Sequence, residues 1–221
     1  ILLVHALRTQ WMPKGGFGKL AEALAGLIEE KGGTLRTGTE VTRILLNDVE
    51  KVVGVETASG ETIRAKAVVS ACDARRTYLD MLPETATPDS FRERLQTMEL
   101  SPSIFQVQLG VDMDLEPYRK DIQRLNFFYS SADIDHGMAQ FPQGNIDEAA
   151  FFLYVATFHQ PEMAPPGKHS LKLEAYTTLH SRGIDWERDK QALGDVLIRR
   201  SEALIPGLSQ HIVTRAHRTP E

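Results

Sequence analysis

The sequence predicts a mixed α/β fold of the α+β kind, built in two parts. Three patterns predict it: an amphipathic helix after a glycine-rich turn, a β-hairpin pattern after that helix, and alternating strand patterns with further helices in the second half. The composition changes between these parts. We therefore expect a first domain over residues 1–80 and a second over residues 81–221.

The first helix is expected from Gly16 onward. Apolar residues recur at the i, i+3, i+4 and i+7 spacing and charged residues take the opposite side, which predicts one buried face. The apolar positions are Phe17, Leu20, Ala21, Leu24, Leu27 and Ile28. Gly32 and Gly33 should end the helix, because glycine tolerates the positive φ of a left-handed cap.

Short strands are expected after this helix. Residues 34–37 and 41–46 have strand patterns, and residues 52–65 predict a hairpin whose turn is Ala-Ser-Gly. The segment AVVSA, residues 67–71, combines small and β-branched side chains without a polar alternate. This composition predicts a strand that is covered on both faces.

The second part predicts a sheet with helices. Thr87 as N-cap and Pro88 in the first turn should begin a helix that ends near Leu100. Three alternating patterns predict strands, at residues 103–113, 151–158 and 169–179. The prolines and glycine of residues 159–168 exclude regular structure there, and residues 185–204 predict another helix.

Composition excludes several classes of protein. The chain has 25 basic and 30 acidic residues, a net charge of −5 and no basic stripe, so we expect no nucleic-acid partner. No apolar run reaches the roughly 18 residues that cross a bilayer. We expect a cytoplasmic protein, with peripheral membrane contact left open and no prediction of oligomeric state. The chain begins without methionine, in mid-pattern, which indicates a fragment of a longer protein.

No local pattern identifies a catalytic residue or a metal site. The seven histidines form neither an H-E-x-x-H motif nor an i, i+4 pair, and no G-x-S-x-G elbow occurs. Cys72 is the only cysteine, which excludes an intrachain disulfide and a cysteine-based zinc site. Because it ends the predicted strand 67–71, we expect an inert, packed thiol.

The glycine-rich turn at residues 15–19, GGFGK, leaves two interpretations open. A phosphate-binding P-loop requires Ser or Thr where Leu20 stands, so this class is excluded. A dinucleotide fingerprint could use Gly16, Gly18 and Ala21, but the preceding RTQWMPK is not an apolar strand. Spacing alone therefore allows either a nucleotide-binding turn or a simple helix start.

Several stretches, in order along nearly the whole chain, resemble the flavin-dependent phytoene desaturase family. This family includes carotenoid isomerases and retinol saturases within the amine-oxidase-like flavoproteins. The stretches are WMPKGGFGKLAEALAGLIEEKGG, TGTEVTRILL, GVETASGETIRAKAVVSACDA, LP at 82–83, LSPSIFQVQLGV, APPGKHSL and ALIPGLSQHIVTRAHRTPE. The resemblance implies an internal fragment, with part of a Rossmann-like FAD-binding domain, including the hairpin, followed by a sheet-and-helix substrate domain that is incomplete at its C-terminus.

The resemblance also implies cofactor-binding residues. Val41 matches a valine that meets the adenine of FAD through backbone groups, and Ala71 and Cys72 lie on the segment that runs toward the cofactor. Gly15 and Gly16 match a turn that borders the flavin ring and the substrate cavity. The G-x-G-x-x-G motif for the pyrophosphate is absent. We therefore expect FAD in the full-length protein and weak or no FAD binding by this chain alone.

For the parent protein, the resemblance implies an FAD-dependent oxidoreductase that acts on a hydrophobic polyene or isoprenoid by dehydrogenation, saturation or isomerisation. The fragment alone should be inactive. The cofactor carries the difficult chemistry, so the catalytic residues stay unassigned. The expected substrate-lining residues are Trp11, Met12, Phe127 and Phe128.

Three alternatives remain beside this interpretation. An amine-oxidase-type flavoenzyme would share the cofactor segments but act on a polar substrate. A cofactor-free module could bind an apolar ligand without any redox chemistry. A purely structural fragment would bind no ligand at all.

Overall fold

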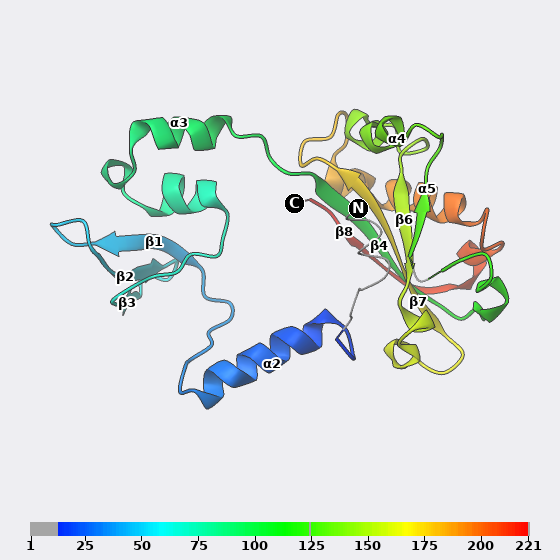
Figure 1. Cartoon of the computed structure of the whole chain (residues 1–221), viewed down its shortest axis with the longest axis horizontal. Coiled ribbons are helices and arrows are strands. Elements are labelled where there is room, and N and C mark those ends of the chain that lie inside the picture. The colour runs from blue at the N-terminus through cyan, green and yellow to red at the C-terminus, as the bar shows by residue number, and fades with distance from the viewer. Residues whose placement is uncertain (1–12, 124, 221) are drawn as a thin grey trace. The chain divides into compact units, whose positions relative to one another are not determined.

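The computed structural model describes residues 13–123 and 125–220. These residues divide into two compact units, 22–100 and 13–21 with 101–220 (Figure 1). The division of the whole protein at residues 80 and 81 stays a prediction. The α-helices and strands, in chain order, are α2 Phe17–Glu30, β1 Val41–Leu46, β2 Val52–Thr57, β3 Thr62–Arg64, α3 Asp89–Thr97, β4 Ser103–Val111, β5 Leu125–Phe128, α4 Ile134–Gln140, β6 Phe151–Val155, β7 His169–Thr177, α5 Trp186–Ser201 and β8 Ile212–Arg218. A π-helix spans Arg76–Met81, and short 3-10 helices occur between the other elements.

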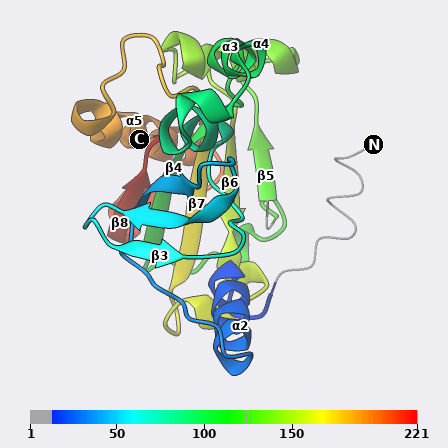
Figure 2. The same ribbon diagram turned by 90° about the vertical axis from the view of Figure 1, so that its left-hand side faces the viewer.

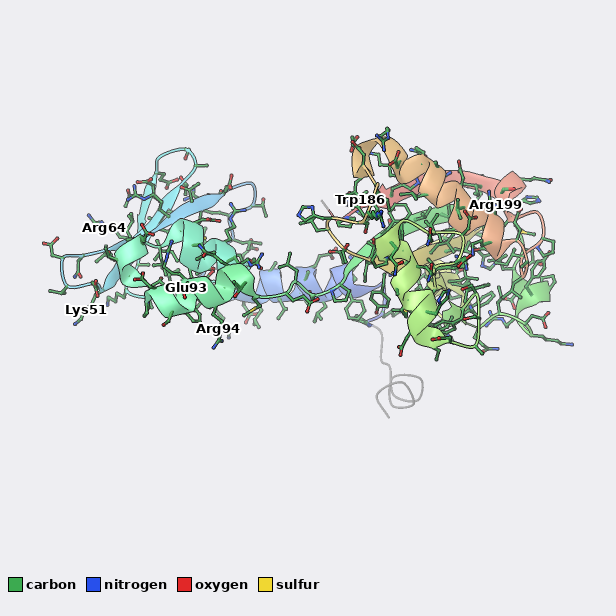
Figure 3. All side chains as sticks on the ribbon, turned by 90° about the horizontal axis from the view of Figure 1, so that it is seen from above. Lys51, Arg64, Glu93, Arg94, Trp186 and Arg199 are labelled. Atoms are coloured by element: carbon green, nitrogen blue, oxygen red, sulfur yellow. The ribbon has the colours of Figure 1, made fainter. Side chains whose placement is uncertain are left out.

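The unit of residues 22–100 contains a three-stranded antiparallel sheet in the order β1-β2-β3. The predicted hairpin is confirmed, with Val55 paired to Ile63. Gly54 permits a close approach of the two strands, because a Cβ there would lie 2.3 Å from the carbonyl oxygen of Ile63. Figure 3 labels Lys51, directly before β2, Arg64 at the end of β3, and Glu93 and Arg94 of α3.

One arginine in the segment before α3 forms hydrogen bonds with the C-terminal end of this helix. The Arg75 guanidinium donates hydrogen bonds to the carbonyl oxygens of Leu95 at 2.7 Å, Gln96 at 3.0 Å and Met98 at 2.5 Å. The last carbonyl groups of a helix have no partner within the helix, and a cation there also interacts favourably with the helix dipole. Arg75 therefore serves as the C-terminal cap of α3.

The second unit contains a five-stranded antiparallel sheet in the order β5-β6-β7-β4-β8 (Figure 2). The central pair, β4 and β7, is joined over nine residue pairs, from Ser103–Thr177 to Val111–His169. One face of the sheet is buried against α5 and the connecting turns; α5 begins at Trp186 and carries Arg199 in its last turn (Figure 3). The predicted strands at 103–113, 151–158 and 169–179 and the helix at 185–204 are confirmed, with shorter bounds.

Phe105 lies at the centre of this core and is fully buried. Its ring centroid is 5.9 Å from that of Phe141, 5.8 Å from that of Trp186 and 6.2 Å from that of His217. Each ring comes from a different element: Phe105 from β4, Phe141 from the turn that follows α4, Trp186 from α5, and His217 from β8. The aromatic cluster therefore joins α5 to the middle of the sheet.

Helix α2 is confirmed, but the prediction of a buried face is wrong for the described residues. Gly32 has φ +80°, and the Gly33 amide donates to the Ile28 carbonyl oxygen at 2.8 Å, which is the expected left-handed end. No residue of α2 is buried, however, and Phe17 is 63% exposed. The amphipathic spacing determines which face is apolar, whereas burial requires a packing partner that the described residues do not supply.

Two predicted strands are absent from the described residues. Residues 34–37 and 67–71 have no strand conformation, and Val69 is 93% exposed. A strand forms only when a neighbouring strand satisfies its backbone hydrogen bonds. Neither segment has such a neighbour here, so the expected coverage of 67–71 on both faces is also wrong.

The start of α3 differs from the prediction by one residue. Pro88, with φ −56° and ψ 139°, is the N-cap, and the helix begins at Asp89. Thr87 is buried instead, and its Oγ1 has no hydrogen-bond partner among the described residues. The extended backbone of Pro88 therefore turns the Thr87 side chain away from the helix end that it was expected to cap.

Three elements have no counterpart in the sequence-based prediction: β5, α4 and β8. Strand β5 is four residues long, and α4 is seven. Strand β8 contains arginine and histidine at alternate positions with only moderate burial. Short or polar segments of this kind give too few apolar repeats to identify a period.

Truncation of Phe105 should severely destabilise the protein. We expect Phe105→Ala to lower the free energy of unfolding by about 3–5 kcal/mol, because it removes a fully buried ring and leaves a cavity. Its neighbour Ile104 is 40% exposed on the opposite face, so Ile104→Ala should cost less than about 1 kcal/mol. Urea unfolding followed by circular dichroism checks both values, and equal losses would contradict the described register.

Candidate functional site

The outer face of the five-stranded sheet, opposite the core, carries a row of side chains that changes from apolar to polar. Directly paired residues of neighbouring strands point to the same face of a sheet. The pairs Phe127–Phe152, Phe152–Glu174 and Gln106–Glu174 therefore place one row across β5, β6, β7 and β4. The aromatic end of this row lies at β5 and its amide end at β4.

A pocket of about 420 Å³ lies at the aromatic end of this row. We call it the aromatic pocket, and its lining residues are Leu125, Phe127, Tyr129, Ile134, Met138, Phe152, Glu174 and Tyr176. The rings of Phe127 and Phe152 meet edge to face with centroids 4.8 Å apart, and those of Phe152 and Tyr176 do so at 5.2 Å. The pocket therefore presents ring faces and ring edges to an apolar ligand.

The two predicted phenylalanines of β5 point in opposite directions. Phe127 lines the aromatic pocket, whereas the ring of Phe128 stacks on that of Phe151 at 4.4 Å and packs against the core. Successive side chains of a strand point to opposite faces of the sheet, so these two neighbouring phenylalanines lie on different faces. Trp11 and Met12 lie outside the described residues. The role of all four residues in lining a substrate site stays a prediction.

Among the residues that the structure describes, Glu174 is the one charged residue that lines the aromatic pocket. Its Oε1 atom accepts a hydrogen bond from Gln106 Nε2 and lies 2.9 Å from Lys172 Nζ. The Lys172 ammonium also lies 5.5 Å from the centre of the Tyr154 ring. Lys172 therefore compensates the negative charge of Glu174.

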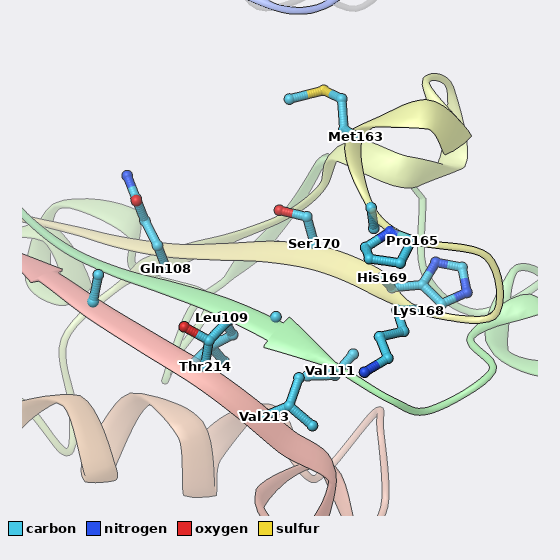
Figure 4. A pocket seen from close by; sticks show the side chains of 13 residues that line it. Gln108, Leu109, Val111, Met163, Pro165, Lys168, His169, Ser170, Val213 and Thr214 are labelled. Atoms are coloured by element: carbon cyan, nitrogen blue, oxygen red, sulfur yellow. The ribbon is translucent and has the colours of Figure 1, made fainter.

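A second pocket of about 390 Å³ opens on the same unit, at the other end of β4 and β7 (Figure 4). Its lining residues are Gln108, Leu109, Gly110, Val111, Met163, Ala164, Pro165, Lys168, His169, Ser170, Val213, Thr214 and Ala216. The Nδ1 atom of His169 lies 2.8 Å from the Thr157 hydroxyl oxygen. Burial lowers the pKa of His169, which favours a neutral ring beside this pocket.

The predicted turn at Gly15 and Gly16 borders this second pocket. Both glycines have positive φ, +80° and +85°, which other residues adopt only with strain. A Cβ at Gly16 would lie 3.5 Å from the Cε of Met163, which lines the pocket. The turn is thus in contact with the pocket wall.

Gln160 holds this turn in place. Its Oε1 accepts a hydrogen bond from the Gly15 amide at 3.0 Å, and its Nε2 donates to the Pro13 carbonyl oxygen at 3.1 Å. The Gln160 side chain is buried, so these two bonds replace its contacts with water. No local motif in the sequence indicates this residue, because its partners lie about 145 positions earlier in the chain.

Val41, Ala71 and Cys72 belong to the unit of residues 22–100. Val41 is the first residue of β1, which is an edge strand with β2 as its one strand neighbour in the described part of the chain. An edge strand directs backbone N–H and C=O groups away from the sheet. Ala71 is exposed and has a small side chain. Their contact with a cofactor stays a prediction.

The expectation of a buried Cys72 is wrong, because the thiol is exposed. Residues 67–71 form no strand that could cover it. Its Sγ lies 3.1 Å from the Ser70 hydroxyl oxygen and 3.2 Å from that of Thr77, and all three residues line a pocket of about 310 Å³. The hydrogen bonds of Ser70 and Thr77 lower the pKa of the Cys72 thiol.

Removal of the Ser70 hydroxyl should raise the pKa of the Cys72 thiol. At neutral pH the thiolate fraction then falls, and we expect Ser70→Ala to slow alkylation by iodoacetamide roughly two- to fivefold, because the thiolate is the reactive form. The two rates should converge at high pH, where both thiols are ionised. Ser90→Ala, in the first turn of α3, is the control. An unchanged pH–rate profile for Ser70→Ala would contradict the described contacts.

Residues 13–123 and 125–220 contain neither a cluster of metal ligands nor a membrane-spanning helix. No group of three or more histidine, cysteine, aspartate or glutamate residues in these ranges could hold a metal ion. In the same ranges, none of the helices has the length and the apolar content to cross a membrane.

Curated relatives cover nearly the whole chain. Over 95% of its length, the chain is 28% identical to prolycopene isomerase 2, chloroplastic, of an Oncidium hybrid cultivar. It is 26% identical over 86% of its length to all-trans-retinol 13,14-reductase of Danio rerio, and 26% identical over 94% to phytoene desaturase (neurosporene-forming) of Rhodobacter capsulatus. The chain spans only 35%, 33% and 40% of these three relatives.

Solved structures share the fold. A reduced UDP-galactopyranose mutase matches with a TM-score of 0.65 at 16% identity, over 94% of this chain and 40% of its own. An oxidoreductase from Methanosarcina mazei matches with a TM-score of 0.60 at 18% identity, over 93% of this chain and 42% of its own. Residues 6–206 match the sequence model described as flavin containing amine oxidoreductase, and the chain therefore belongs to this family.

Proposed function

We propose that the protein carrying this chain is an FAD-dependent oxidoreductase that acts on a hydrophobic polyene or isoprenoid. The family description supports a flavin cofactor. The names of the relatives, a prolycopene isomerase, a retinol reductase and a phytoene desaturase, support a conjugated isoprenoid substrate. The observation that carries the proposal is the aromatic pocket on the outer face of the five-stranded sheet.

The lining of the aromatic pocket favours a polyene over a polar amine. Phe127, Phe152 and Tyr176 supply ring faces and edges, and burial of a conjugated chain against them removes apolar surface from water. A cationic amine would require an uncompensated negative charge. The Glu174 carboxylate, the one charged lining group among the described residues, is already paired with Lys172 at 2.9 Å.

Two sets of residues, each taken within its own unit, would suit contact with a part of a flavin dinucleotide. The open edge of β1 at Val41 offers backbone groups, which suit adenine because adenine needs one donor and one acceptor. In the turn of Gly15 and Gly16, Gly16 has no side chain at the wall of the second pocket, which would suit the approach of a planar ring. Ala71 and Cys72 are the further cofactor-binding candidates. When bound, the flavin would supply hydride exchange with the substrate or support its isomerisation.

Gln160 and the residues of the aromatic pocket would have separate tasks in such an enzyme. Gln160 fixes the Pro13–Gly16 turn through two hydrogen bonds, so the turn needs little reorganisation when a ligand arrives. The aromatic pocket orients the apolar chain and excludes water. Because the chain has no pyrophosphate-binding G-x-G-x-x-G motif, we expect it to bind FAD weakly or not at all by itself.

Polyene binding tests the proposal directly. We expect all-trans-retinol, titrated by its own fluorescence, to bind the chain, and Phe127→Ala to weaken binding by roughly tenfold, since burial of one aromatic side chain contributes about 1.5–3 kcal/mol. Phe17→Ala is the matched control, because Phe17 is 63% exposed and does not line the aromatic pocket. Equal effects of both substitutions, or tighter binding of spermine than of retinol, would contradict the proposal.

A further inference from the structure

We propose that the Glu174 carboxylate recognises a hydroxyl group on the polyene, so that the aromatic pocket prefers a polyene alcohol to the same polyene without a donor group. This inference rests on the proposed function and adds a residue that determines specificity. It starts from an unusual feature of the pocket. Of the eight described side chains that line it, seven are aliphatic or aromatic, including Tyr129 and Tyr176, and the eighth, Glu174, is a carboxylate.

The register of the sheet places Glu174 at the wall of the pocket. It is paired with Phe152 on β6, and Tyr176 follows two positions later on the same face of β7. The Phe152 and Tyr176 rings meet edge to face at 5.2 Å. A ligand that lies against these rings therefore brings one end close to the carboxylate.

The two oxygen atoms of Glu174 differ in their contacts. Oε1 takes both the hydrogen bond from Gln106 Nε2 and the ion pair with Lys172 Nζ at 2.9 Å. Oε2 accepts no hydrogen bond from the residues that the structure describes. The side chain is only 21% exposed, so Oε2 is partly withdrawn from water. A ligand donor would restore the hydrogen bond that this partial burial removes.

The chemistry of the carboxylate selects the type of donor. Lys172 compensates its charge, so an ammonium group gains little attraction that would offset its loss of water. A carboxylate on the ligand would be repelled by Glu174 and offers no donor when ionised. A neutral hydroxyl donates a hydrogen bond to a carboxylate oxygen without adding charge to the pocket.

Gln106 and Gln108 keep the carboxylate in this position. Gln108 Nε2 donates to Gln106 Oε1 at 2.9 Å, and Gln106 in turn donates through Nε2 to Glu174 Oε1. The chain of amides fixes the direction of Oε1 and leaves Oε2 as the remaining acceptor. An acceptor that is already fixed discriminates more strongly between ligands with and without a donor group, because less side-chain entropy is lost on binding.

The experiment compares all-trans-retinol with its methyl ether, which has the same polyene but no hydroxyl donor. We expect the wild-type chain to bind the alcohol about tenfold more tightly than the ether, as is typical of a hydrogen bond to a charged group. Glu174→Gln should reduce this preference, and Glu174→Met, which has no oxygen acceptor, should abolish it. The affinity for the ether should stay within about twofold of the wild type in both variants.

Controls separate this inference from the proposed function. Glu187→Gln, on the exposed surface of α5, should leave the preference unchanged, and circular dichroism checks that each variant is folded. Equal binding of alcohol and ether by the wild type would overturn the role of Glu174 while polyene binding stands. A preference that persists in Glu174→Met would do the same. Failure of both ligands to bind would overturn the proposed function and this inference together.

Discussion

The nine-pair register between β4 and β7 is the constraint on which both faces of the second unit depend. Because side chains alternate along a strand, this register sends Phe105 into the core and Gln106 and Glu174 to the outer face. A shift of one residue would exchange the two faces. The same register therefore stabilises the core and builds the row that ends at the aromatic pocket.

The proposed function assigns different tasks to the two units. In the unit of residues 22–100, the edge strand β1 offers backbone groups to a cofactor, and small residues follow the hairpin. In the other unit, the outer face of the sheet provides an apolar pocket with one charge-compensated carboxylate, Glu174. Cofactor chemistry needs few catalytic side chains, so the selectivity of such an enzyme depends on the shape and polarity of this pocket.

Local patterns in the sequence predicted the elements whose periodicity is strong. The hairpin and the strands β4, β6 and β7 follow from alternating apolar residues, whereas the substrate-lining role of Phe127 comes from the family resemblance and stays a prediction. The segments 34–37 and 67–71 were wrong as strands because pairing depends on a distant neighbour. Gln160 and Glu174 were not identified, since their importance arises from contacts across about 145 and 68 positions of the chain.

Methyl NMR of methionine tests the central claim, that the outer face of the sheet binds a polyene, most directly. Met138 lines the aromatic pocket, whereas Met98 is exposed in the other unit and does not line it. In a chain labelled with ¹³C at the methionine methyl groups, addition of all-trans-retinol should shift the Met138 resonance and leave the Met98 resonance unchanged. The shift arises because a ligand in the aromatic pocket changes the magnetic environment of the Met138 methyl group. A shift at Met98 with none at Met138 would contradict the account.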